Sequence, residues 1–180
     1  MLVDAGTADA GQPTTLHRSL VAAAGADTLR DARGLAIDRR SPLRAASLGT
    51  GPTDLTILRP VWIFLDWSIR LPSGYRLARA TLVLHGVSGD AQVDVRTYLE
   101  NGLLTSSDFS MTSTSGGHIV GPSGDDGSTW SFDVTSYVAN AIAGGHHLGV
   151  RAQVFPETVN GAPTNQERVF DACRLELDFV

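Results

Sequence analysis

The stretch Ala80–Leu99 reads ATLVLHGVSGDAQVDVRTYL and decides the fold class. It holds two short runs, Ala80–His85 and Gln92–Leu99, in which apolar and polar side chains alternate. This alternation is typical of half-buried β-strands, because successive side chains of a strand point to opposite faces of the sheet. In the second run the two faces are Val93, Val95, Thr97 and Leu99 against Asp94, Arg96 and Tyr98.

Strand-like runs continue on both sides of this pair, separated by turn signals such as the LPSG of Leu71–Gly74. A long loop is predicted over Gly116–Gly127, which reads GGHIVGPSGDDG. Many short strands at regular spacing predict an all-β fold, an antiparallel jelly-roll β-sandwich. The further strands are predicted at Leu58–Ile69, Trp130–Val134, Leu148–Phe155 and Cys173–Val180.

One short helix is predicted over Thr135–Ala143. Asp133 or Thr135 can cap its first turn, and Gly144 with Gly145 ends it. Its apolar stripe is Val138, Ala141 and Ile142.

The first third of the chain differs from the rest in composition. Residues 1–61 contain no aromatic residue, and Met1–Thr15 is small, polar and rich in turn-forming residues. Aromatic side chains supply much of the buried area of a core, so this third is expected to contribute little to it. We therefore predict an extended N-terminal arm at residues 1–24, held by a neighbouring subunit, and a sandwich domain at residues 25–180.

Overall composition limits the function classes. A chain of 180 residues with 42% hydrophobic and 18% charged residues suits one globular domain. No run approaches the roughly 20 apolar residues that span a bilayer, so no membrane partner is predicted. The net charge of −5 argues against a general nucleic-acid binder. The N-terminus lacks a basic region followed by an apolar run, so export by the usual route is not expected.

No catalytic or metal-binding set is predicted, and no cofactor. Cys173 is the single cysteine and stands in an apolar strand face, where a buried thiol is expected. His146 and His147 are adjacent in a segment that enters a strand, so their side chains should point to opposite faces. Asp125-Asp126-Gly127 is acidic and turn-like; a turn is favoured there over a calcium site. The protein is therefore predicted not to be an enzyme.

Basic residues cluster early in the chain, interleaved with aspartates. This mixture suits pairing with an acidic neighbour across a subunit interface, and a simple solvated surface is the alternative. The interface candidates are Arg30, Arg33, Arg39, Arg40 and Arg44.

Four segments resemble the DNRLRE-type domains, which are carbohydrate-binding-module-like β-sandwiches. Arg59–Gly86 (RPVWIFLDWSIRLPSGYRLARATLVLHG) resembles the family's core strands and turn, and Trp130–Arg151 (WSFDVTSYVANAIAGGHHLGVR) its capped helix and following strand. Ala26–Thr28 is similar to the opening of these domains, and Arg168–Phe179 (RVFDACRLELDF) to their closing strands. The resemblance implies the same sandwich fold across roughly residues 25 to 180.

The sequence also departs from the family pattern. The family usually has a tryptophan where this chain has Ala141, and Leu103–Phe109 lacks the family's tryptophan. The shared motifs are mainly structural, so they specify a fold rather than a ligand.

Two functions follow as expectations. The first is a non-enzymatic structural protein of a larger assembly, most plausibly a bacteriophage virion surface component such as a capsid decoration or tail protein, located in the virion. It would contact other subunits as a homo-oligomer or a hetero-assembly. The alternative is an extracellular or cell-surface module that binds host glycans, with Trp67, Tyr98 and Trp130 as exposed contact candidates.

Overall fold

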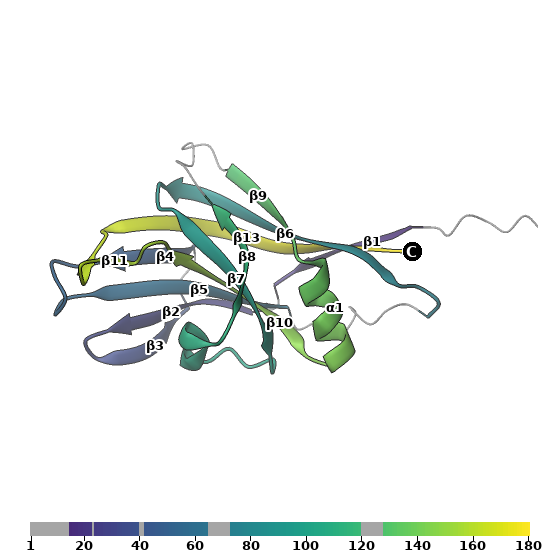
Figure 1. Ribbon diagram of the computed structural model, residues 1–180, viewed down its shortest axis with the longest axis horizontal. Helices are drawn as coiled ribbons and strands as arrows, with labels where there is room; N and C mark the ends of the chain where they lie inside the picture. Colours follow the sequence, from purple (N-terminus) through teal and green to yellow (C-terminus); the bar gives the residue numbers. More distant parts are fainter. Residues whose placement is uncertain (1–14, 23, 40–41, 65–72, 120–127) are drawn as a thin grey trace, which may run out of the picture.

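The computed structural model describes residues 15–22, 24–39, 42–64, 73–119 and 128–180 (Figure 1). The all-β prediction is confirmed, while the jelly-roll path stays a prediction. The strands are β1 Leu16–Val21, β2 Ala24–Asp31, β3 Gly34–Asp38, β4 Leu43–Leu48, β5 Thr56–Phe64, β6 Leu77–Gly89, β7 Val93–Glu100, β8 Thr114–Ile119, β9 Ser128–Asp133, β10 His147–Val154, β11 Thr158–Val159, β12 Ala162–Pro163 and β13 Gln166–Phe179.

Antiparallel pairing arranges the strands in two layers. One layer has the order β9-β6-β13, and the other has the order β8-β7-β10-β5-β2-β3. Figure 1 shows β6, β9 and β13 above β2, β3 and β5. Strand β4 pairs with β13 through Leu43–Ser47 and with β5 through Ala46–Leu48, so it joins the two layers along one side.

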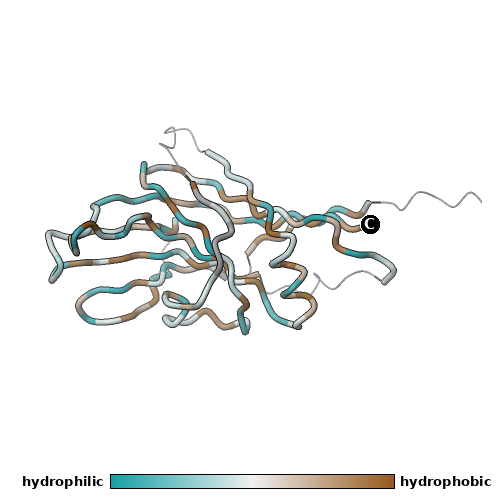
Figure 2. The backbone as a smooth tube through the Cα atoms, viewed as in Figure 1, coloured by the Kyte–Doolittle hydropathy of each residue, from teal (hydrophilic) through white to brown (hydrophobic). Residues whose placement is uncertain are grey.

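The core lies between the layers. Every second residue of the long strands faces it, as the alternation of apolar and polar positions along the chain in Figure 2 illustrates. Each fully buried aliphatic side chain contributes about 1.5–3 kcal/mol through the apolar area it removes from water. Core residues with no solvent exposure include Leu82, Leu84, Leu175 and Leu177 from one layer and Val93, Val95, Val150 and Ala152 from the other.

The predicted helix is confirmed as α1, Thr135–Gly144. Asp133 accepts hydrogen bonds from the Thr135 main-chain N–H at 3.0 Å and from its hydroxyl at 2.7 Å. These bonds lower the pKa of the Asp133 carboxyl. Gly145 ends the helix in the left-handed conformation, with φ of 66°. The helix buries Val138 and packs on β6 and β10.

Several details of the sequence prediction differ from the structure or fall partly on residues that it does not describe. Residues 116–119 of the predicted long loop belong to strand β8, Thr114–Ile119, and residues 120–127 lie outside the described part. A short 3₁₀ helix, η2 at Ser106–Ser110, was not predicted. The predicted strand over Leu58–Ile69 is observed as far as Phe64, and residues 65–72 are not described.

The N-terminal third contributes more than its composition indicates. Residues 1–14 lie outside the described part of the chain, but β1, placed in the predicted arm, pairs with β13 of the same chain. Leu16 and Leu20 pack against the main core from β1. Leu43 and Ala45 are core members, so the expectation that this third adds little to the core is wrong. The contribution comes from small and aliphatic side chains, several of them on β4 between the two layers.

In the part of the chain that the structure describes, no helix combines the length and apolar character needed to cross a bilayer.

Candidate functional site

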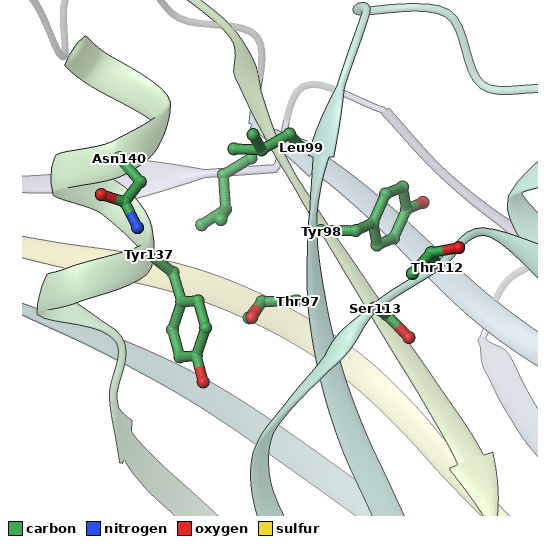
Figure 3. Close-up of a pocket in the computed structure, with 8 residues that line it drawn as sticks. Thr97, Tyr98, Leu99, Thr112, Ser113, Tyr137 and Asn140 are labelled. Atoms are coloured by element: carbon green, nitrogen blue, oxygen red, sulfur yellow. The ribbon is translucent and has the colours of Figure 1, made fainter. Parts of the chain in front are cut away.

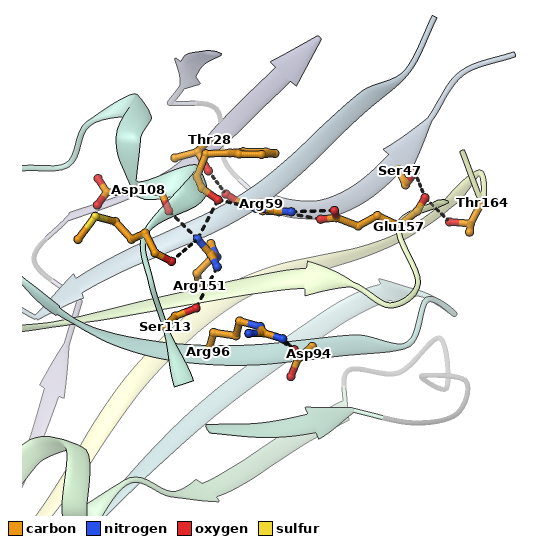
Figure 4. A network of polar contacts seen from close by, with 12 residues as sticks. Thr28, Ser47, Arg59, Asp94, Arg96, Asp108, Ser113, Arg151, Glu157 and Thr164 are labelled. Carbon is orange, nitrogen blue, oxygen red and sulfur yellow. Dashed lines mark hydrogen bonds and ion pairs between the residues drawn. The ribbon is translucent and has the colours of Figure 1, made fainter. Parts of the chain in front are cut away.

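A polar cluster covers the outer face of the β5–β10 layer (Figure 4). The Arg59 guanidinium binds the Glu157 carboxylate through two parallel contacts, both of 2.7 Å. The same guanidinium donates to the main-chain carbonyl of Phe109 and lies 4.0 Å from the centroid of its ring. Both charged side chains are largely buried, with exposed fractions of 14% and 16%. Arg59 therefore ties the η2 segment and the Glu157 loop to β5.

Arg151 performs a similar task from β10. Its Nη1 donates to the carbonyls of Asp108 at 2.9 Å and Phe109 at 2.8 Å, and its Nη2 donates to the Ser113 hydroxyl at 3.0 Å. Burial, with nearby Arg59 as a second cause, lowers the pKa of Arg151 to about 10. The guanidinium stays charged at neutral pH, and these carbonyls replace part of its lost hydration.

Two buried carboxyl groups meet where η2 packs on β7. Asp108 accepts hydrogen bonds from the Thr105 main-chain N–H at 2.6 Å and from the Tyr98 hydroxyl at 3.3 Å. Glu100 is 4% exposed, and burial followed by its hydrogen bond with Asp108 raises its pKa. The hydrogen bond from the Tyr98 hydroxyl to Asp108 thus links η2 to β7.

A pocket of about 360 Å³ opens at the edge of β7 beside α1 (Figure 3). The Thr97 side chain points to the side of β7 on which α1 carries Tyr137 and Asn140, whereas the Tyr98 ring points to the opposite side. None of the described residues that line it carries a charge. They are Thr97, Tyr98, Leu99, Thr112, Ser113, Tyr137, Asn140 and Leu148.

The arginines predicted for an interface lie mostly around the β2–β3 hairpin. Arg30, Arg33 and Arg39 are exposed, and Arg30 lies 5.2 Å from the centroid of the Phe109 ring. Arg44 lies apart on β4, with its Nη1 4.0 Å from a Glu167 oxygen. Arg40 lies outside the described residues. The structure therefore places three of the five on one hairpin, with Arg33 and Arg39 at opposite ends of β3.

The main-chain N–H of Arg44 donates to a buried aspartate. Asp27 accepts this bond at 2.8 Å and is 1% exposed. Burial raises the pKa of Asp27 to about 7, and Asp38, directly opposite on β3, adds to the rise. This carboxyl lies on β2 of the hairpin that carries the exposed arginines, and its pKa of about 7 is close to neutral pH.

The aromatic glycan candidates do not form an exposed group. Tyr98 is 5% exposed, so its predicted exposure is wrong; its ring lies over Gly149, and the η2 segment covers it. Trp130 is half-buried and stacks over the guanidinium of Arg168, with 4.9 Å from the guanidinium carbon to the ring centroid. Trp67 lies outside the described residues.

The remaining chemical candidates are a buried thiol, histidines and acidic residues, some of which the structure does not describe. Cys173 is buried, as predicted, and burial raises the pKa of its thiol, which keeps it protonated and unreactive. Across the described ranges, histidine, cysteine and acidic side chains form no group of three suited to a metal ion. Asp125 and Asp126 fall outside those ranges.

Comparison of the chain with models of known protein families and with curated proteins finds no match. The likeness to DNRLRE-type domains therefore depends on the motifs of the sequence alone.

Sequence reasoning missed the polar cluster and the pocket. Arg59 stands far in the sequence from Arg151 and Glu157, and only the pairing of β5 with β10 brings the two arginines together. One signal was present: Arg151 and Arg59 interrupt otherwise apolar strands, and a charged residue in such a place needs a partner.

Proposed function

We propose that this chain is a non-enzymatic structural protein of a larger assembly, with the β2–β3 hairpin as its contact surface. The supporting observation is the edge of β3, which among the described strands pairs with β2 alone. An open edge presents unpaired main-chain N–H and C=O groups, and soluble proteins usually protect such edges or use them for binding.

The side chains at this edge support the same role. Leu35, on β3, is 45% exposed, and Arg33 and Arg39 are exposed at either end of the strand. An apolar residue flanked by arginines resembles the centre and rim of a protein interface. The specific assembly that the sequence favours is a bacteriophage virion, with the protein on its surface as a capsid decoration or tail component.

The contacts that the buried charged side chains make also fit a non-catalytic protein. Arg59, Arg151 and Asp108 hold the η2 segment on the sheet through the contacts described above. These side chains are engaged by the fold itself, so we assign them a structural rather than a chemical task.

The test is incorporation of an epitope-tagged chain into particles made by the cells that express it. The tagged protein should sediment with the particles in a sucrose gradient. Leu35→Lys should abolish co-sedimentation, because an edge lysine opposes strand addition. Leu103→Lys is the matched control: Leu103 is 67% exposed but lies outside the strands, so this variant should sediment like the wild type. Wild-type protein that stays at the top of the gradient would contradict the proposal.

A further inference from the structure

Strand β1 joins the sheet through one edge only. It pairs with β13 over six residue pairs, from Leu16 with Phe179 to Val21 with Arg174, and with no other described strand. Strand β6 pairs with the opposite edge of β13 from Arg168 to Phe179. If β1 left its place, β13 would therefore stay in position and would present a row of open main-chain N–H and C=O groups.

The place that β1 occupies is specific for its sequence. Leu16 and Leu20, four residues apart, pack against the main core. On the exposed face of the same strand, His17 Nδ1 lies 2.8 Å from a carboxylate oxygen of Asp178. Main-chain pairing alone would accept any extended segment, but these side-chain contacts require the β1 pattern. A second copy of this chain carries that pattern.

The connection from β1 to β2 is short and joins the two layers. Strand β1 ends at Val21 beside β13, and β2 begins at Ala24 beside β5, so only residues 22 and 23 lie between them. Short hinges of this kind favour exchange of an element between copies. The exchanged element re-forms the same contacts in the other copy, so the exchange costs little.

The surface beside this hinge is apolar and incompletely packed. Val21 is 74% exposed, and a pocket of about 260 Å³ lies between Val21 and Ala22 on one side and Trp62 on the other. Residues 171–173 of β13 also line it, and no described strand pairs with this edge of β13 there, between the ends of β4 and β1. A second hinge laid against this surface would cover Val21 and fill part of the pocket.

We infer that β1 exchanges between two copies of this chain, so that each β1 pairs with β13 of the other copy in the register seen here. The partner is thus a second copy, and the new contacts are those between the two hinges. This surface is separate from the contact proposed above. Figure 1 shows β1 and the C-terminal end at one end of the molecule and the turn of the β2–β3 hairpin toward the other.

Mixed single-cysteine variants test which copy holds β1. Ser19 and Glu176 are opposite one another in the ladder, and the Ser19 hydroxyl donates to the Glu176 carboxylate at 2.9 Å. Full-length Ser19→Cys and Glu176→Cys chains are mixed, unfolded in urea, refolded together and oxidised. Exchange should give a disulfide between the two substituted positions, identified by mass spectrometry of the joined peptides. The native Cys173 is buried, which keeps it out of this reaction.

The control replaces Glu176→Cys by Thr129→Cys, at an exposed position of β9 in the same layer. It measures disulfides that form by random collision and should give only traces of joined peptide with Ser19→Cys. A yield from the Ser19→Cys and Glu176→Cys mixture no greater than that of the control would overturn the inference.

The mass in solution gives a second readout. The wild-type chain should sediment at twice the mass of one copy. Insertion of Gly-Ser-Gly-Ser-Gly after Ala22 lengthens the hinge and lets β1 fold back on its own β13, so the dissociation constant of the dimer should rise roughly tenfold or more. The same insertion after Gly51, in the turn between β4 and β5, should leave it unchanged. A wild-type chain that sediments as a single copy, or a dimer that the hinge insertion does not weaken, would refute the exchange.

Discussion

The ring of Tyr98 lies directly over Gly149, its partner across the β7–β10 pair. A Cβ atom at Gly149 would come within 2.5 Å of two ring carbons. The glycine thus creates the space in which the ring covers Val61 and Ile63 and in which its hydroxyl reaches Asp108.

Gly149→Ala is therefore expected to destabilise the fold. The ring must move, and overpacking of this kind typically costs about 1–3 kcal/mol. Urea unfolding followed by tryptophan fluorescence measures the change. Gly51→Ala is the control, because a Cβ atom there meets nothing within 4 Å. Equal losses of stability in the two variants would show that the Tyr98 contact is not the cause.

Glu157→Gln should also destabilise the protein. It leaves the largely buried Arg59 guanidinium without its carboxylate, and removing one partner of such a pair costs about 3–5 kcal/mol. Glu167→Gln, which weakens the more exposed Arg44–Glu167 pair, should cost less than about 1 kcal/mol. A double-mutant cycle with Arg59→Gln measures the coupling. A coupling energy near zero would contradict a stabilising role for the Arg59–Glu157 ion pair.

Asp27→Asn should stabilise the protein at high pH. Burial raises the pKa of Asp27 to about 7 in the folded state, so the folded protein favours the protonated carboxyl. Stability from this group is present near pH 4 and is lost as the pH rises through about 7. An asparagine keeps an oxygen for the Arg44 N–H and never ionises. The gain above pH 7 should reach up to about 4 kcal/mol, at about 1.4 kcal/mol per pKa unit.

Urea unfolding of wild type and Asp27→Asn between about pH 4 and pH 8 tests this. The two curves should separate as the pH rises. Asp90→Asn, at an exposed position, should stay parallel to the wild type throughout. Parallel curves for Asp27→Asn would show that the buried carboxyl is not the titrating group.

His17 should make the attachment of β1 depend on pH. Its ring nitrogens lie 2.8 Å from an Asp178 oxygen and 3.1 Å from a Glu176 oxygen. The hydrogen bond to Asp178 is the main cause that raises the pKa of His17. The protonated ring holds β1 on β13, so the attachment is fully present below about pH 6.5 and weakens as the pH rises through the raised pKa.

Amide-exchange protection factors of residues 16–21 measure this attachment, once the intrinsic pH dependence of exchange is removed. They should fall relative to those of β6 as the pH rises, and His17→Gln should remove that difference. His147→Gln, on β10, is the control. A pH dependence that survives in His17→Gln would contradict the assignment.

The sequence predicted the layers better than the contacts within the site. Alternation placed Val93, Val95 and Thr97 on one face of β7, and that face does contact the core. The same pattern left Tyr98 exposed, because alternation cannot tell that residues 101–113 fold back over the second face. The guanidinium of Arg151 holds this segment in place by hydrogen bonds to the carbonyls of Asp108 and Met111. These residues lie about 40 positions before Arg151 in the chain, so a local pattern does not reveal the contact.

Helix α1 was predicted closely because its signals are local. Asp133 and Gly145 act within a residue or two of the helix ends, so the sequence alone contains the relevant interactions. The pocket beside it could not be predicted, since it depends on where β8 separates from β7. That the buried Thr97 hydroxyl makes no hydrogen bond within the described chain is likewise evident only from the three-dimensional structure.

The pairing of Leu16 with Phe179 sets how this protein bears mechanical load. Strand β1 enters and β13 leaves at the same end of their antiparallel ladder, so tension applied to the two ends of the described chain opens the ladder one residue pair at a time. Resistance to such unzipping is low, because each step breaks few bonds at once. Strand β13 remains held by β6 along its other edge while β1 detaches. Pulling by the two ends should therefore release β1 as a compliant tether of six residues and leave the sandwich intact.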